Sequence, residues 1–251
     1  MYLRFAAERG RPFHEMVARI GATKPRRVVD LGCGPGNLTE TLARRWPGAV
    51  IEGLDSSPEM IAEARAKTTG VDYEIGDVRD FEPGDDVDVI VTNALLQWVP
   101  GHEELLARWV RPGRWIAMQV PANYDEPAHV MLRDLCASPR WAGRLGDLQE
   151  KVRQVGGAIH YARLFRAAGC DHVDTWETKY IHQLPVVAGG RHPVLEWLSG
   201  TGMRPIRQAL TGTEWEEFCD EYEAALRRGY PLERVVDFAF LRVFAVAYRK
   251  A

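Results

Sequence analysis

The sequence predicts an α/β fold in which a doubly wound, largely parallel sheet is flanked by helices. One short apolar run, residues 28–31, is followed by closely spaced glycines and then by apolar residues at helical intervals. A second apolar run, residues 50–54, follows that helix and ends in Asp55. Further apolar runs of strand length occur at residues 73–75, 87–92 and 114–120. Strands alternating with helices are typical of parallel sheets, which bind ligands at the carboxyl ends of their strands.

Within the N-terminal segment, residues 2–20, a helix is predicted that has Pro12 in its first turn, where a missing N–H costs no hydrogen bond. Its apolar residues recur at helical spacing, at Phe13, Met16, Val17 and Ile20. Three arginines lie in or ahead of this helix, Arg4, Arg9 and Arg11. They form either a solvated basic face or part of a lid, residues 1–22, that presents cations to an anionic substrate.

The next helices and strands follow from local signals. A helical pattern begins near Leu38 and ends at Pro47-Gly48, where the chain turns into the second strand. Ser57 is a suitable N-cap for a third helix, because Pro58 occupies its first position. The third strand ends before Asp77, and the fifth strand follows a turn at Pro112-Gly113. These signals complete the alternating part of the chain.

The second half of the chain departs from this alternation. Residues 125–168 and 192–228 read as mostly helical, whereas residues 173–182 and 235–248 predict a sixth and a seventh strand. We therefore expect one domain of residues 1–251. Its helical cap would consist of residues from about 121–170 and 185–235, together with the N-terminal lid.

Composition limits the possible classes of function. The hydrophobic fraction of 46% and the charged fraction of 27% are ordinary for a globular protein. A net charge of −3 gives no reason to expect nucleic acid as a partner. The four cysteines fit no zinc spacing, and no apolar run approaches the length of a membrane helix, so we expect no metal and no membrane. Without a secretory signal, free thiols favour a cytoplasmic location.

The loop after the first strand carries the most specific chemistry. Gly32, Gly34 and Gly36 let a ligand approach the main chain closely, and Asp55 is suited to accept hydrogen bonds from a ribose diol. A dinucleotide fingerprint would need glycine where Asn37 stands, and no lysine of a P-loop follows. The loop is therefore expected to bind a nucleoside without a pyrophosphate. A glycine-rich turn that serves only packing is the alternative.

The segment from Asp30 to Asn37, DLGCGPGN, together with the later Asp55, resembles motif I of the class I S-adenosylmethionine (SAM) methyltransferases. The whole chain is similar to the trans-aconitate 2-methyltransferase family. The matching segments are residues 2–5, 7–12, 55–58, 60–65, 93–94 with 96–98, 126–127 with 129–130, 182–183 with 185, and 201–202 with 204–205. The resemblance implies a seven-stranded sheet whose last strand is antiparallel. It also implies methyl transfer from SAM to a carboxylate of trans-aconitate or a close tricarboxylate.

The resemblance further implies a cofactor site. The glycine loop would line the methionine tail, the carbonyl of Asn93 would face its ammonium, and Asp77 would bind the adenine amino group unless it only caps a turn. The full set is Asp30, Gly32, Gly34, Gly36, Asn37, Asp55, Ser56, Ser57, Met60, Asp77, Val78 and Asn93.

The acceptor would be a small-molecule polycarboxylate. A carboxylate with a pKa near 4 is ionised at neutral pH, so we expect no general base and assign no catalytic residue. Arginines suit the carboxylates that do not react, because a guanidinium binds a carboxylate through two parallel hydrogen bonds. The predicted substrate residues are Arg4, Arg9, Arg11, Trp98, His129, Tyr161, His182 and Arg204.

Three alternatives stay open. The fold could serve another small-molecule acceptor, or it could bind SAM without catalysis. A nicotinamide-dependent oxidoreductase on a similar sheet is disfavoured by Asn37 and by the terminal strand pair. The sequence predicts neither the oligomeric state nor the ester position.

Overall fold

The structure is a computed structural model that describes residues 6–67, 69–151, 155–200 and 202–251. Its contacts divide these residues into two compact units. The sheet unit consists of the described residues within 7–121, 155–177 and 242–251, and the helical unit of residue 6 and the described residues within 122–151 and 178–241. The predicted boundaries of the cap and the lid stay a prediction, because a division by contacts does not test them.

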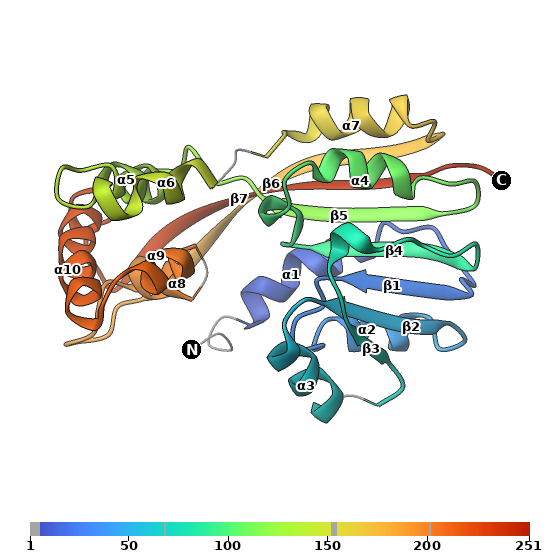
Figure 1. Cartoon of the computed structure of the whole chain (residues 1–251), viewed down its shortest axis with the longest axis horizontal. Helices are drawn as coiled ribbons and strands as arrows, with labels where there is room; N and C mark the ends of the chain where they lie inside the picture. The colour runs from blue at the N-terminus through green and yellow to red at the C-terminus, as the bar shows by residue number, and fades with distance from the viewer. Residues whose placement is uncertain (1–5, 68, 152–154, 201) are drawn as a thin grey trace. The chain divides into compact units, whose positions relative to one another are not determined.

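The sheet confirms the predicted fold class. Seven strands occur in the order β3-β2-β1-β4-β5-β7-β6, and β7 is antiparallel to β5, pairing from Trp115 with Tyr248 to Pro121 with Arg242 (Figure 1). The strands are β1 (Arg27–Leu31), β2 (Val50–Asp55), β3 (Asp72–Ile75), β4 (Val87–Asn93), β5 (Trp115–Pro121), β6 (His172–Pro185) and β7 (Val235–Tyr248). The chain reverses its winding direction between β1 and β4, which is where open α/β sheets bind ligands.

Five helices belong to the sheet unit. They are α1 (Ala6–Val17), α2 (Thr39–Arg45), α3 (Pro58–Lys67), α4 (His102–Trp109) and α7 (Ala158–Ala167). α2 contacts β2, α3 contacts β2 and β3, and α4 and α7 contact each other. The predicted cap of α3 is present, since the Ser57 hydroxyl accepts a hydrogen bond from the Met60 N–H at 3.3 Å.

The predicted start of the first helix is wrong. α1 begins at Ala6, so Pro12 lies inside the helix instead of in its first turn. A proline in a helix interior removes one hydrogen bond and crowds the preceding turn. The side chains of Phe13 and Met16 on the same helix are completely buried. Tertiary packing of this kind outweighs local propensity, which the sequence pattern alone does not measure.

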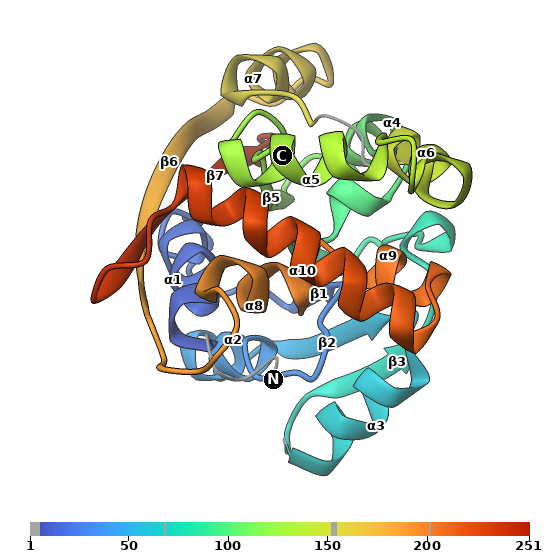
Figure 2. The ribbon, with the colours of Figure 1, turned by 90° about the vertical axis from the view of Figure 1, so that its left-hand side faces the viewer.

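The helical unit packs five helices around its own core. They are α5 (Pro127–Cys136), α6 (Ala142–Lys151), α8 (Pro193–Ser199), α9 (Arg204–Ala209) and α10 (Gly212–Gly229), and α10 contacts both α5 and α8 (Figure 2). Thr211 and Glu214 form a capping box that begins α10, and basic Arg227 and Arg228 occupy its last turn. Buried aromatic side chains such as Trp197, Tyr222 and Phe238 fill the core.

Candidate functional site

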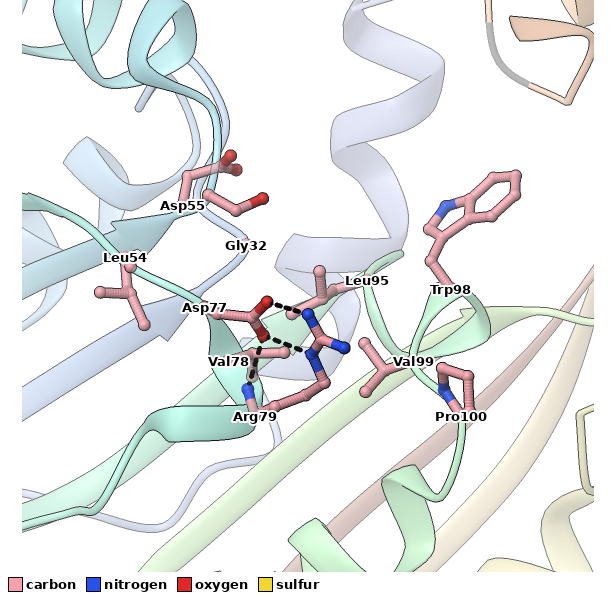
Figure 3. Close-up of a pocket in the computed structure, with 12 residues that line it drawn as sticks. Gly32, Leu54, Asp55, Asp77, Val78, Arg79, Leu95, Trp98, Val99 and Pro100 are labelled. Atoms are coloured by element: carbon pink, nitrogen blue, oxygen red, sulfur yellow. Dashed lines mark hydrogen bonds and ion pairs between the residues drawn. The ribbon is translucent and has the colours of Figure 1, made fainter. Parts of the chain in front are cut away.

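The carboxyl ends of neighbouring strands in the sheet unit surround an open pocket of about 260 Å³. Asp55 comes from the end of β2, and Asp77 from the segment after β3 (Figure 3). The complete lining is Gly32, Leu54, Asp55, Ser56, Gly76, Asp77, Val78, Arg79, Leu95, Trp98, Val99 and Pro100. Two carboxylates, a glycine turn and an apolar wall suit a nucleoside, whose ribose and base edge are polar and whose ring faces are not.

The glycine loop between β1 and α2 adopts backbone angles that other residues rarely adopt. Its three glycines have φ values of +75°, +55° and +78° at Gly32, Gly34 and Gly36. A Cβ on Gly36 would collide with the hydroxyl of Tyr73, and a Cβ on Gly32 would lie 2.9 Å from Leu95. By contrast, a Cβ on Gly34 would meet no atom within 4 Å. Two of the glycines therefore allow close packing, whereas Gly34 keeps open the space in front of the loop.

Asp55 connects the loop with the start of α3. One carboxylate oxygen accepts a hydrogen bond from the Gly34 N–H, and the other accepts one from the Ser57 N–H, both at 2.9 Å. An ionised carboxylate has about four lone-pair positions, so both oxygens keep acceptor capacity. The two backbone bonds therefore fix the orientation of Asp55 and leave it able to bind a diol.

Asp30 lies buried at the end of β1, with 3% of its surface exposed. Its carboxylate accepts a hydrogen bond of 2.7 Å from the Thr39 hydroxyl. The pKa of Asp30 is raised to about 7, mainly by burial and to a smaller extent by the charge of Asp55, while the bond from Thr39 opposes both effects. Burial therefore favours the neutral carboxyl of Asp30, and a nearby cation would favour its charged form.

Asp77 is held by Arg79, two residues further along the chain. One Asp77 oxygen accepts from the Arg79 backbone N–H and from its Nε, each at 2.9 Å, and the other accepts from Nη2 (Figure 3). These bonds lower the pKa of Asp77 to about 2. Asp77 is thus an ionised acceptor at neutral pH, and one position on its second oxygen remains for the amino group of a base.

The end of β4 provides polar atoms beside this pocket. Ala94 has a φ of +57°, unusual for a residue with a Cβ, and its carbonyl accepts a hydrogen bond from Gln97. The buried side-chain oxygen of Asn93 has no hydrogen-bond partner among the described residues. Unsatisfied buried acceptors are uncommon in native structures, and a bound donor would satisfy this one.

The structure brings five of the twelve predicted cofactor residues together in the pocket lining: Gly32, Asp55, Ser56, Asp77 and Val78. The other seven do not line it. Gly34 and Ser57 donate backbone hydrogen bonds to Asp55, and Asn37 is exposed. Gly36 lies against Tyr73, and Met60 is half-buried on α3. Asp30 and Asn93 are placed as described above.

The predicted substrate residues of the sheet unit are not gathered in one place. Trp98 is 49% exposed and lines the same pocket as Asp55 and Asp77. Arg11 is exposed and pairs with Glu15 at 2.7 Å. Arg4 lies outside the described residues, as does the side chain of Arg9.

Tyr161 on α7 is completely buried and is hydrogen-bonded to another helix. Its hydroxyl lies 2.9 Å from Nε2 of His102 on α4, whose Nδ1 lies 3.2 Å from the Val99 carbonyl. Burial raises the pKa of Tyr161, and the charge of Glu103 contributes less. The tyrosine therefore supports the rim of the pocket at Val99 through His102.

Three predicted substrate residues belong to the helical unit. The ring of His182 stacks on Trp197 with 4.5 Å between the ring centroids. His129 lies beside Phe240, and Arg204 is exposed at the start of α9. Burial, followed by the charge of Arg133, lowers the pKa of His129 to about 4. At neutral pH this histidine is uncharged.

Several residues of the site were missed in the sequence. Leu54 and Gly76 line the pocket directly beside the predicted Asp55 and Asp77, so their positions could have been inferred from their neighbours. Arg79 and the partner of Asp30, Thr39, carry no signal of their own, because their roles depend on side-chain bonds. No group of three or more His, Cys, Asp or Glu within the described residues could hold a metal ion. No helix in that part of the chain is long and apolar enough to cross a bilayer.

Comparisons with known proteins agree with this geometry. Residues 28–113 match the family model described as a methyltransferase domain. The chain is 51% identical to a trans-aconitate 2-methyltransferase of Mycolicibacterium gilvum, over 98% of this chain and 96% of the relative. A solved putative methyltransferase from Bacillus halodurans shares the fold, with a TM-score of 0.60 and 13% identity over 95% of this chain and 98% of the other. Phosphoethanolamine N-methyltransferase 2 of Haemonchus contortus, solved with SAM, has a TM-score of 0.54 and 13% identity, over 96% of this chain and 53% of the other.

Proposed function

The chain belongs to the trans-aconitate 2-methyltransferase family of SAM-dependent enzymes, and from this we propose that it converts trans-aconitate to a monomethyl ester. The near full-length likeness to the Mycolicibacterium gilvum relative is the observation that supports the proposal most strongly. It covers the helical unit as well as the sheet unit. The other product is S-adenosylhomocysteine.

The sheet unit has the features that SAM requires. Asp55 is oriented for the ribose, Asp77 is an ionised acceptor for the adenine amino group, and Gly34 faces open space where the methionine tail would pass. Asp30 and the unsatisfied oxygen of Asn93 are acceptors suited to the ammonium of that tail. SAM supplies a methyl group activated by a positively charged sulfur.

The remaining chemistry makes modest demands on the protein. A carboxylate is already ionised at neutral pH, so no residue has to remove a proton from it. Opposite charges neutralise as the methyl moves, and water slows such a step because it solvates the separated charges best. The residues around the pocket would therefore contribute most by excluding water and by holding the acceptor carboxylate close to the methyl group that SAM would supply.

The proposal predicts a methyl ester when the full chain is incubated with SAM and trans-aconitate, detected by mass spectrometry of the product. Asp55→Ala should reduce kcat/KM by about 100-fold or more, because the carboxylate's two hydrogen bonds from the ribose hydroxyls are lost, each worth ~1.5–3 kcal/mol. Tryptophan fluorescence titration should show that SAM binds the wild type. Binding of SAM without methylation of any polycarboxylate would contradict the substrate assignment.

A different small-molecule acceptor is the second candidate, because nothing in the cofactor pocket depends on the acceptor. A panel of small acids, alcohols and amines, assayed by release of S-adenosylhomocysteine, separates the two. We propose in addition that the acceptor is a small polycarboxylate and that the protein is cytoplasmic. The relatives' shared acceptor supports the first, and the four free cysteines support the second, because thiols stay reduced in the cytoplasm.

A further inference from the structure

Helix α5 carries a half-buried arginine on a different face from its core contacts. Ala128, Leu132 and Cys136 are buried in the core of the helical unit. His129 and Arg133 lie four residues apart and are therefore neighbours on the adjoining face of the helix.

Arg133 is held firmly and yet has no anionic partner. Its guanidinium lies 3.7 Å from the centroid of the Tyr124 ring, and Nη1 donates a hydrogen bond to the Tyr124 carbonyl. No carboxylate among the described residues lies within ion-pair distance of it. The other half-buried arginine of the helical unit, Arg191, is paired with Asp220, Glu216 and Glu223. Nε and Nη2 of Arg133, which together bind carboxylates bidentately, therefore remain available.

Two polar side chains close to Arg133 in the sequence have buried nitrogens: His129 lies one turn before it on α5, and Asn123 precedes Tyr124, which contacts the guanidinium. Nδ1 of His129 and Nδ2 of Asn123 have no hydrogen-bond partner within the described ranges. The Asn123 oxygen accepts from the Leu241 N–H at 2.6 Å, which identifies the free end of the amide as its donor. The pKa of His129, about 4, keeps the imidazole neutral, so it can donate from one nitrogen. The nearby acid Glu126 is paired with Lys179 at 2.7 Å.

One permanent cation, one amide donor without an acceptor, and a neutral imidazole that can carry its proton on Nδ1 are suited to an anion with planar oxygens. We propose that Arg133, assisted by His129 and Asn123, forms a subsite of the helical unit that binds a non-reacting carboxylate of the acceptor. This inference rests on the proposed carboxyl methylation. It assigns the role to an arginine that the sequence did not single out, in place of Arg11, which is paired with Glu15.

The test replaces Arg133 in the full chain and varies the acceptor. Glutaconate, itaconate and mesaconate each lack one of the three carboxylates of trans-aconitate. With Arg133→Met, we expect the KM for trans-aconitate to rise about 10- to 100-fold, while kcat changes less than about 3-fold. For the dicarboxylate that lacks the bound carboxylate, variant and wild type should have the same kcat/KM. Arg133→Lys keeps the charge but loses the planar pair of N–H donors, so its KM for trans-aconitate should lie between those of the wild type and Arg133→Met.

The matched control is Arg144→Met, which removes an exposed arginine of the same unit that pairs with Glu214. It should leave every kinetic constant unchanged, and the dissociation constant for S-adenosylhomocysteine should be the same in all variants. An unchanged KM in Arg133→Met would overturn the subsite, as would an equal loss on all four acceptors, since a merely structural role affects them alike.

The failure of the proposed function is a separate outcome. If the wild type methylates no polycarboxylate, the substrate assignment fails. Thermal shift of the S-adenosylhomocysteine complex with trans-aconitate then tests the subsite alone. A stabilisation that disappears in Arg133→Met would support the carboxylate subsite, whereas no stabilisation of the wild type would overturn it.

Discussion

The sheet unit and the helical unit differ in how their binding groups are made. In the sheet unit the pocket is formed by strand ends and a glycine loop, so the main chain fixes most of its geometry. In the helical unit the candidate groups are side chains on α5 and on the segment before it, namely Arg133, His129 and Asn123. Backbone sites are specified by a few residues with special conformations, whereas side-chain sites are specified by packing.

Burial shifts the pKa of a titratable group in each unit, and the two shifts have opposite effects on how the stability of the fold depends on pH. It raises the pKa of Asp30 to about 7 in the sheet unit and lowers that of His129 to about 4 in the helical unit. Both shifts favour the neutral form. Asp30 therefore destabilises the fold as pH rises, whereas His129 destabilises it as pH falls.

The largest expected effect comes from Asp30. Between about pH 4 and pH 7 the unfolded chain has lost this proton while the native state keeps it, so the free energy of unfolding falls as pH rises through this window. A shift of this size corresponds to on the order of 4 kcal/mol. Asp30→Asn should remove this slope, measured as the difference between wild type and variant in urea unfolding at pH 5 and pH 8.

Subtracting the variant from the wild type removes the contribution of every other titrating group, provided that the other pKa values are unchanged. His129 contributes in the opposite direction, between about pH 6.5 and pH 4, and cancels from the difference. Parallel pH profiles for wild type and Asp30→Asn would show that the carboxyl is not protonated in the folded protein.

The next effect separates two glycines of one loop. Gly36→Ala should destabilise the fold by about 3 kcal/mol, because its Cβ would press on Tyr73 and the backbone would be strained at a φ of +78°. Gly34→Ala meets no atom and should cost only about 1 kcal/mol of strain. The variant should, however, bind SAM at least 10-fold more weakly, as measured by fluorescence titration.

Both glycines belong to the sheet unit, and neither change touches an ionisable side chain. The pair therefore tests whether the main chain fixes the geometry of the site in that unit. Equal losses of stability in the two variants would contradict the different packing around the two glycines. Unchanged SAM affinity in Gly34→Ala would show that the ligand does not approach the main chain there.

The smallest effect concerns Tyr161. Tyr161→Phe removes the hydrogen bond to His102 and should lower the free energy of unfolding by about 1 kcal/mol, with the KM for the acceptor unchanged. Thermal unfolding and steady-state kinetics check the two parts. A raised KM without a loss of stability would instead support the substrate role that the sequence suggested for this tyrosine.

Much of the fold could be predicted because the informative signals are local. Apolar runs marked the strands, Ser57 and Pro58 marked the start of α3, and β7 occupies the predicted residues 235–248. The start of α1 could not be predicted in this way. Pro12 lies inside the helix, where the burial of Phe13 and Met16 outweighs the local preference of proline.

The candidate site was predictable to the extent that it depends on the backbone. Gly32, Asp55 and Asp77 follow strands and therefore had to meet at one edge of the sheet. The bond between Thr39 and Asp30 joins residues whose contact no spacing rule specifies. Arg133 could not be singled out from the sequence either, because its candidate role depends on the fact that no carboxylate among the described residues pairs with it.

The raised pKa of Asp30 has a consequence for how ligand binding is measured. If the cofactor's ammonium lies near this carboxyl, as we propose, binding expels the remaining proton into the buffer. The heat recorded by calorimetry then varies with the ionisation enthalpy of the buffer, and the slope of that dependence counts the protons released. SAM, which carries an additional sulfonium charge, should release more of them than S-adenosylhomocysteine does.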